Sequence, residues 1–351
     1  VDLIIYNAKI YTINQNFDKA EAMAVSKGKI VAVGSDKEIL EKYASSKKIN
    51  VQQKPVYPGF IDAHCHFTGF ATDRWKSNLV GTKSWEEIVS KIQEYSKKAP
   101  KFWLYGRGWD QNDWAIKEFP SKEKLDELFP NRPVYLKRVD GHAAIANQKA
   151  LDLAKVTVKR KVLGGEVEVK NGKLTGILVD NAMDLVEKVI PPLEDDMAIQ
   201  YFDELQQECF AYGLTSVHDC GISEHTLSLL EKSQQKKALK MNVFALLEDN
   251  PDYYTKWIKK GRYTNGKITV GGFKVYADGA LGSRGACLLK DYHDKPNWKG
   301  FLLSEKAHFQ ELAQKLKNSN LQMCTHAIGD SANRTILKIY ADVLGTKNDR
   351  R

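Results

Sequence analysis

The sequence has no run of about 18 apolar residues, the length that would mark a candidate membrane-spanning helix. It has only five cysteines, which are widely spaced and form no Cys-x-x-Cys pair. This pattern argues against a disulfide framework and a structural zinc knuckle, and it predicts reduced thiols. The chain begins at Val1 rather than Met. We expect a cytoplasmic protein, with the periplasm as the alternative if a signal peptide was removed upstream.

Charge of one sign is not concentrated in any segment. The net charge is +9, but the lysines are spread along the chain and no Lys/Arg stripe alternates with aromatic residues. This distribution predicts a solvated basic surface instead of a nucleic-acid site. We expect a small-molecule substrate and no nucleic-acid or membrane partner, and the excess positive charge favours anionic substrates slightly.

The first part of the chain, residues 1–55, reads as a small β unit. It contains β-rich runs at 3–6, 22–25 and 30–33, with a hairpin turn at 26–28. Such a segment is too short to be stable by itself. We expect it to be a portion of a β-sandwich that other strands of the chain complete.

From residue 56 onward, apolar strands alternate with helical patterns, which is typical of βα units and of a parallel α/β sheet. The strand candidates are 56–63, 134–138, 215–218, 242–247, 272–277 and 321–325. Helices are expected from Ser84, over about 197–212 with Phe202, Leu205, Cys209 and Tyr212 on one face, and over about 305–318. Two insertions are expected, at about 67–133 and at about 160–180. Five tryptophans in the first favour a satellite core over a lid, and Asn171-Gly172 in the second predicts a hairpin.

The segment Pro58–His66 carries the clearest chemical signal. An apolar strand runs directly into His64-Cys65-His66. Alternate residues of a strand point to the same face, so the two imidazoles converge at the strand's carboxyl end, where β/α barrels carry their active sites. Two neutral imidazoles form half of a site for zinc or a similar ion. We favour this metal site over the alternative of two ordinary histidines.

Lys274 stands inside the otherwise apolar strand 272–277. A buried lysine is costly unless it is paired or chemically changed. One interpretation is carboxylation by carbon dioxide, which makes a ligand able to bridge two metals. The alternatives are pairing with an acid such as Asp278, or a side chain that reaches the barrel mouth. Sequence reasoning leaves these open.

Other polar residues also follow apolar strands. His326 could bring a third imidazole to the metal, and we favour this over a lone core histidine. His142, in the segment Val139–Asn147, could polarise a substrate carbonyl or steady its oxyanion. Asp278 and Arg284 occupy a Gly-rich loop where substrate contacts are expected. Further candidates with equally good structural interpretations are the pair His218-Asp219 and Asp110.

Taken together, these motifs resemble the amidohydrolase superfamily, in the branch of YtcJ-like proteins and N-substituted formamide deformylases. The resemblance rests, in chain order, on Pro58–His66, Asp140–Asn147, Gly213–Asp219, Gly272–Arg284 and His326–Asp330. It implies a TIM-like barrel that holds one or two divalent metal ions, with zinc as the default. The residues that match the family's metal ligands are His64, His66, Lys274 as the carboxylated lysine, and His326. His142 matches a substrate-contacting histidine.

The implied reaction is hydrolysis of a C–N bond other than a peptide bond, such as an amide or formamide. A metal-held hydroxide would attack the carbonyl carbon while the metal polarises the carbonyl oxygen. The family continues with a further histidine strand and an aspartate that serves as general acid/base, and neither precedes Arg351 here. We therefore expect a barrel incomplete at its C-terminal end, weak or absent hydrolysis, and open edges that allow a homo-oligomer.

A second departure concerns the position of the lysine. Lys274 lies on the fifth strand candidate, whereas bridging lysines of the family usually lie on the fourth. This leaves open that one candidate strand lies outside the barrel. The rival interpretation of the whole chain is a catalytically inactive barrel that acts as a binding or regulatory protein.

Overall fold

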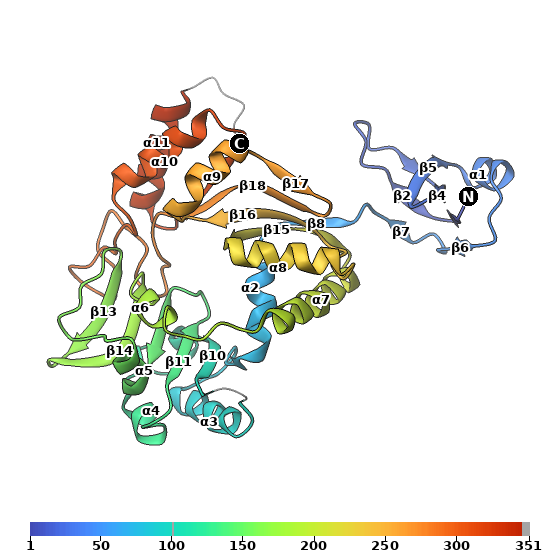
Figure 1. Ribbon diagram of the computed structural model, residues 1–351. Coiled ribbons are helices and arrows are strands. Elements are labelled where there is room, and N and C mark those ends of the chain that lie inside the picture. The colour runs from blue at the N-terminus through green and yellow to red at the C-terminus, as the bar shows by residue number, and fades with distance from the viewer. Residues whose placement is uncertain (100–101, 346–351) are drawn as a thin grey trace. The chain divides into compact units, whose positions relative to one another are not determined.

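The computed structural model describes residues 1–99 and 102–345. Within them the chain forms two compact units. The smaller comprises residues 1–62 and 209–216, and the larger comprises residues 63–208 and 217–351. Both contain β-sheet, and the larger combines sheets with helices (Figure 1). The predicted α/β class is therefore confirmed.

The smaller unit contains two short sheets. The first has the order β5-β4-β1-β6 and the second β3-β2-β7. Their strands are β1 (Leu3–Tyr6), β2 (Lys9–Tyr11), β3 (Lys19–Ala20), β4 (Ala22–Ser26), β5 (Lys29–Gly34), β6 (Lys48–Asn50) and β7 (Pro55–Val56). The three predicted strands are confirmed, as is the turn between β4 and β5, where Lys27 and Gly28 both have positive φ. Completion of a sandwich by further strands stays a prediction.

Helix α1 (Asp36–Lys42) of the smaller unit was not predicted. The Ser35 side chain accepts from the backbone N–H of Glu38, and the Glu38 carboxylate accepts from that of Ser35. This reciprocal capping box is visible in the sequence as Ser35-x-x-Glu38. The helix packs Ile39 into a small core with Ile4 and Ala24.

Most of one sheet, which we call the main sheet, lies in the larger unit, while its residues 60–62 and 214–216 belong to the smaller unit. The main sheet has the order β17-β18-β16-β15-β8, and β19 also pairs with β18. Its strands are β8 (Phe60–Cys65), β15 (Leu214–Ile222), β16 (Asn242–Glu248), β17 (Tyr263–Asn265), β18 (Ile268–Tyr276) and β19 (Gln322–His326). β18 runs parallel to both β16 and β19, whereas β17 is antiparallel to it. The polar residues at the carboxyl ends of β18 and β19 therefore emerge at one edge of the sheet.

Two of the five helices beside this sheet, α7 and α10, were predicted from the sequence, and the other three were not. The five are α7 (Asp195–Ala211), α8 (Glu224–Gln235), α9 (Pro251–Lys260), α10 (Lys306–Lys317) and α11 (Asp330–Leu344), and they flank the sheet in Figure 1. The expected inward residues Phe202 and Leu205 of α7 are buried. Tyr212 is the exception: it follows the end of α7 and is 81% exposed, because the chain turns there into Gly213 with positive φ.

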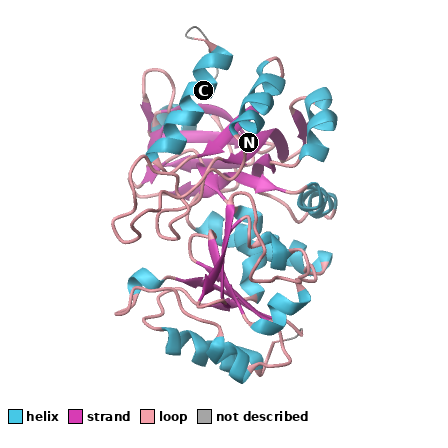
Figure 2. Cartoon of the chain, turned by 90° about the vertical axis from the view of Figure 1, so that its left-hand side faces the viewer, coloured by secondary structure: helices cyan, strands magenta, loops and turns pink. Residues whose placement is uncertain are grey.

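The predicted strand 134–138 lies in a second sheet of the larger unit, of order β13-β14-β12-β11-β10-β9. Its strands are β9 (Ser77–Asn78), β10 (Leu104–Trp109), β11 (Val134–Arg138), β12 (Ala143–Ala146), β13 (Gly165–Lys170) and β14 (Lys173–Asp180). Figure 2 shows it as a separate layer with its own helices. The candidate strand that lies outside the main sheet is therefore 134–138. Without it, Lys274 lies on the fourth of the strands β8, β15, β16 and β18, if the short antiparallel strand β17 is not counted.

We call residues 67–190, which contain this second sheet, the inserted layer. The helices that cover the sheet are α3 (Trp85–Ser96), α4 (Glu123–Leu128), α5 (Gln148–Leu153) and α6 (Asp184–Glu187), and 3-10 turns lie at Asp73–Trp75 and Gln111–Asp113. Helix α2 (Phe67–Thr72) instead contacts Phe202 of α7 and Asp219 of β15. Trp103, Trp109 and Trp114 are buried in its cores, which confirms the satellite core. The hairpin β13–β14 turns at Asn171 and Gly172, both with positive φ, as the sequence predicted.

Two expectations from composition are also answered. All five cysteines are free thiols in the structure. Among the described residues, no helix combines the length and apolar character that crossing a membrane requires.

A half-buried ion pair in the larger unit predicts pH-dependent stability. Nε2 of His308, on α10, lies 2.8 Å from Oδ2 of Asp249, and this hydrogen bond raises the pKa of His308 above its ordinary 6.5. A raised pKa in the folded state means that the stabilisation is full below about pH 6.5 and is lost as pH rises through the folded-state pKa. We expect His308→Gln to lower the free energy of unfolding by about 1 kcal/mol at about pH 5.5 and by less above neutrality.

Denaturant unfolding at several pH values measures this difference. His293→Gln is the matched control, because His293 is exposed and lies in a loop. A loss of stability in the His308 variant that stays constant with pH would show that the imidazole acts only through packing.

Candidate functional site

His64 and His66 lie where the strand argument placed them, at the carboxyl end of β8. Their ring centroids are 6.0 Å apart. Burial lowers the pKa of His66, and the neighbouring Lys274 and His64 lower it further. Both effects favour the neutral imidazole, which is the form that binds a metal ion.

Lys274 is the partner of His64. Its Nζ lies 3.2 Å from Nε2 of His64, and the residue is only 2% exposed. Within the described part of the chain no carboxylate pairs with it, and burial lowers its pKa. The sequence left open that Lys274 pairs with Asp278 or that its side chain reaches solvent. The structure shows neither arrangement.

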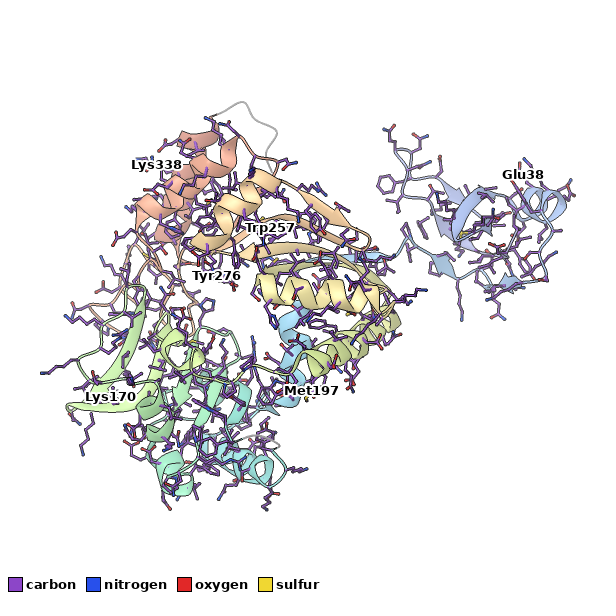
Figure 3. The ribbon with its side chains drawn as sticks, viewed as in Figure 1. Glu38, Lys170, Met197, Trp257, Tyr276 and Lys338 are labelled. Atoms are coloured by element: carbon purple, nitrogen blue, oxygen red, sulfur yellow. The ribbon has the colours of Figure 1, made fainter. Side chains whose placement is uncertain are left out.

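A second group forms around His142 and His326. Their rings stack with centroids 5.0 Å apart at an interplanar angle of 30°. Tyr276 packs against both rings, at 6.2 Å from His142 and 5.4 Å from His326. Figure 3 shows Tyr276 at the end of β18, on the side toward the inserted layer. Strand ends of the main sheet and a loop of the inserted layer thus supply this group together.

His326 does not join His64 and His66. Its Nε2 lies 3.3 Å from the carbonyl oxygen of Gly279, which can only accept, so this nitrogen is the donor. Burial and the neighbouring His142 lower the pKa of His326. The two groups are connected through Lys274, whose Nζ lies 5.0 Å from the centre of the Tyr276 ring.

The expected convergence of three imidazoles on one cation is therefore not found. Across residues 1–99 and 102–345, no three His, Cys, Asp or Glu side chains come together as a ligand set. What the structure does bring together is His64, His66 and the amine of Lys274. Two imidazoles and a buried amine fit one divalent ion if that amine becomes a carboxylate, because nitrogen and oxygen donors suit zinc.

Asp278 organises loops and is enclosed by them. Its carboxylate accepts three backbone N–H groups, from Cys287 at 2.8 Å, Ile328 at 2.9 Å and Gly329 at 2.8 Å. With no exposed surface, it is placed to join the loop after β18 to the loop after β19. The predicted substrate contact by Asp278 has no counterpart in this geometry.

Arg284 lies away from the histidines. Its guanidinium pairs with Asp294 at 2.7 Å and faces the ring of Phe119 at 5.6 Å. Together with Glu166 and Lys295 these residues line a separate cavity of about 180 Å³ beside the hairpin β13–β14. The structure thus does not bring Arg284 to His64 and His66.

The weaker candidates, His218, Asp219 and Asp110, make contacts that stabilise the fold. The ring of His218 packs on Phe244 at 4.7 Å. Asp219 accepts from the backbone N–H of Thr68 at 2.9 Å and from its hydroxyl at 2.6 Å, which satisfies a donor near the start of α2. Asp110 caps the 3-10 turn that begins at Gln111.

Arg138, which the sequence reasoning missed, is a buried charge at the centre of this region. It is 2% exposed, donates to Gln111 at 2.8 Å and forms ion pairs with Asp110 and Asp140. The other oxygen of Asp140 accepts the backbone N–H of His142 at 3.0 Å. The guanidinium thus fixes the loop that carries His142, and its sequence signal was an arginine ending the apolar strand 134–138.

Comparison with known proteins decides the family. The sequence profile of the amidohydrolase family matches residues 47–351. The chain belongs to this family. It is 32% identical over 93% of its length to YtcJ of Bacillus subtilis, whose name assigns it to the amidohydrolases, and 26% identical over 99% to an N-substituted formamide deformylase of Arthrobacter pascens.

This amidohydrolase spans 64% of YtcJ and 67% of the deformylase, so it covers less than two thirds of the first of these relatives. Among solved structures, it is similar to an uncharacterized metal-dependent hydrolase of Pyrococcus horikoshii. The TM-score is 0.72 at 27% identity, over 97% of this chain and 68% of the other. The resemblance stated from the motifs is thereby confirmed.

Two further residues of the candidate site escaped the sequence reasoning. Tyr276 lies two positions after Lys274 on the same strand, so the alternation that paired His64 with His66 could have found it. Asp180 contacts His142 through Nδ1 of the ring, and its only signal was a carboxylate at the end of the apolar strand β14.

The buried cluster of Arg138 predicts a large loss of stability when its charge is removed. In Arg138→Met, the carboxylates of Asp110 and Asp140 lose their partner. We expect the free energy of unfolding to fall by about 3 kcal/mol. Denaturant unfolding is the measurement, with Arg334→Met, an exposed arginine on α11, as control. Equal stabilities of the two variants would contradict the role given to Arg138.

Proposed function

We propose that this chain is the major part of a metal-dependent hydrolase that cleaves C–N bonds other than peptide bonds, of the amide or formamide type. The observation that carries the proposal is the contact between Lys274 and His64 at the strand ends. A lysine amine is buried there 3.2 Å from an imidazole nitrogen, and no carboxylate of residues 1–99 or 102–345 pairs with it. The relative named N-substituted formamide deformylase supports the substrate class.

The residues that would hold a divalent ion, with zinc as the default, are His64, His66 and Lys274. When bound, such an ion supplies Lewis-acid polarisation of a carbonyl oxygen and activation of water. Lys274 takes part as a carboxylate: its neutral amine forms a bond to the carbon of carbon dioxide, and the amine proton passes to water. The lowered pKa of Lys274 supports this step, because only the unprotonated amine has a free electron pair.

His142 is proposed to contact the substrate. Its Nδ1 is occupied by Asp180, and within the described residues its Nε2 has no hydrogen-bond partner. The ring is 14% exposed and lies beside Tyr276 and His326. A carbonyl oxygen or oxyanion is the group that such an imidazole nitrogen would bind.

A second candidate function is a binding or regulatory protein that keeps the fold without the chemistry. The observation that favours it is the absence of a set of three metal ligands among the described His, Cys, Asp and Glu residues. The two functions differ in one measurable respect. A hydrolase turns over an N-acyl substrate when it is loaded with metal, whereas a binding protein does not.

Removal of either strand-end imidazole tests the metal site. Mutation of a residue that only hydrogen-bonds to a metal ligand typically lowers metal affinity by about 10–100-fold. We therefore expect His64→Ala and His66→Ala to weaken zinc binding by at least about tenfold and to abolish release of 4-nitroaniline from 4-nitroformanilide. Zinc titration with elemental analysis of the dialysed protein, and absorbance for turnover, are the measurements.

His225→Ala is the control, because His225 is largely exposed and pairs with Asp195 on the protein surface. Unchanged zinc affinity in both site variants would place the metal elsewhere. Zinc binding that depends on His64 and His66, but without turnover of any N-acyl substrate, would favour the binding protein.

Lys274→Met separates stability from function. Methionine fills the space of the lysine chain without a buried amine, so the metal-free protein should become more stable by about 1 kcal/mol. The same change should remove the bicarbonate dependence of zinc uptake, which carboxylation predicts. Thermal unfolding and zinc uptake with and without bicarbonate measure both effects. Lys267→Met, at an exposed position before β18, is the control, and a destabilised Lys274 variant would contradict the argument.

A further inference from the structure

The carboxylate of Asp180 holds one nitrogen of the His142 ring. Oδ1 of Asp180 lies 2.6 Å from Nδ1 of His142, and the Asp180 side chain has no exposed surface. Asp180 is the last residue of β14, and His142 lies in the loop before β12. The two strands pair antiparallel, so the sheet of the inserted layer sets the distance between these residues.

Three features make this position costly. Oδ2 of Asp180 is buried, and among the described residues it has no hydrogen-bond partner. Asp180 has a φ of 49°, in the left-handed region that non-glycine residues seldom adopt. Burial also raises the pKa of its carboxyl group. Unpaired buried oxygens and backbone strain of this kind gather at functional sites, where the surrounding structure maintains them.

The loop after β18 is shaped around the same carboxylate. A Cβ atom at Gly279 or at Gly285 would overlap with the Asp180 carboxylate, so a larger residue at either position would have to displace that carboxylate. The carbonyl oxygen of Gly279 also accepts from His326. The loop, the carboxylate and the two stacked imidazoles therefore form one packed arrangement.

We infer that Asp180 is a positioning residue for His142: by accepting the Nδ1–H it fixes the ring so that Nε2 is the nitrogen presented to the substrate. The inference rests on the proposed function. Rotation of the ring by 180° would break the hydrogen bond to Asp180. The backbone N–H of His142 is held by Asp140, and the stacked His326 covers one ring face. The orientation of the His142 ring is thus fixed at the backbone by Asp140, on one ring face by His326 and at Nδ1 by Asp180.

The test compares Asp180→Ala with Asp180→Asn, whose amide oxygen can still accept from Nδ1–H. On 4-nitroformanilide we expect kcat to fall about 10–100-fold in the alanine variant and less in the asparagine variant, with KM changed less than about twofold. Asp184→Ala, which removes an exposed carboxylate four residues further along, is the control. In a His142→Ala background, Asp180→Ala should have no further effect, because the carboxylate acts only through that ring.

A second readout does not depend on activity. In histidine labelled with ¹⁵N, the nuclear magnetic resonance signals of His142 should show the proton on Nδ1 in the unaltered protein. In Asp180→Ala they should show a mixture of the two tautomers. Assignment uses the His142→Ala variant. Thermal unfolding shows whether each variant is folded, and the asparagine variant keeps the shape of the side chain if the alanine variant is unstable.

The outcomes separate this inference from the proposed function. Unchanged tautomer signals in Asp180→Ala and Asp180→Asn would overturn it, and so would additive losses of activity in the double variant. If no amide is hydrolysed at all, the proposed function fails, while the tautomer signals still decide whether Asp180 orients His142.

Discussion

The burial of Lys274 is the constraint on which the rest of the site depends. An ammonium group cannot be enclosed in an apolar strand at low cost unless a counter-charge accompanies it. Here the enclosed amine faces the His64 imidazole and has no carboxylate partner in the described part of the chain, so the fold favours its neutral form. In the proposed function, this amine is the group that carbon dioxide would convert into a metal ligand.

The inserted layer provides the other half of the site. Asp180 ends β14, His142 lies in the loop directly before the paired strand β12, and Arg138 fixes that loop through Asp140. The ring of His142 packs against His326 and Tyr276, which end two parallel strands of the main sheet. In the proposed function, the imidazole that contacts the substrate comes from the inserted layer, and the residues that would hold the metal come from the end of β8 and from β18.

Asp278 shows why a polar residue after a strand is not in itself evidence of catalysis. The position satisfies the rule that loops at strand ends carry function. Its carboxylate, however, has a structural role, because three backbone N–H groups from two loops converge on it and buried backbone donors must be satisfied. The loop that Asp278 anchors includes Gly279 and Gly285, which make room for the Asp180 carboxylate. Asp278 thus supports the site by fixing the loop that packs against Asp180.

The sequence by itself determined the features that depend on local pattern. Strand alternation placed His64 and His66 together, apolar context marked Lys274 as exceptional, and Asn171-Gly172 fixed the hairpin. The order of motifs determined the family. Only the tertiary structure decided that β11 belongs to the inserted layer, that His326 stacks on His142 rather than joining His64, and that Asp180 holds the ring of His142. The physical reason is that sheet membership and loop encounters arise from contacts between distant segments, which a local period of two or 3.6 residues does not encode.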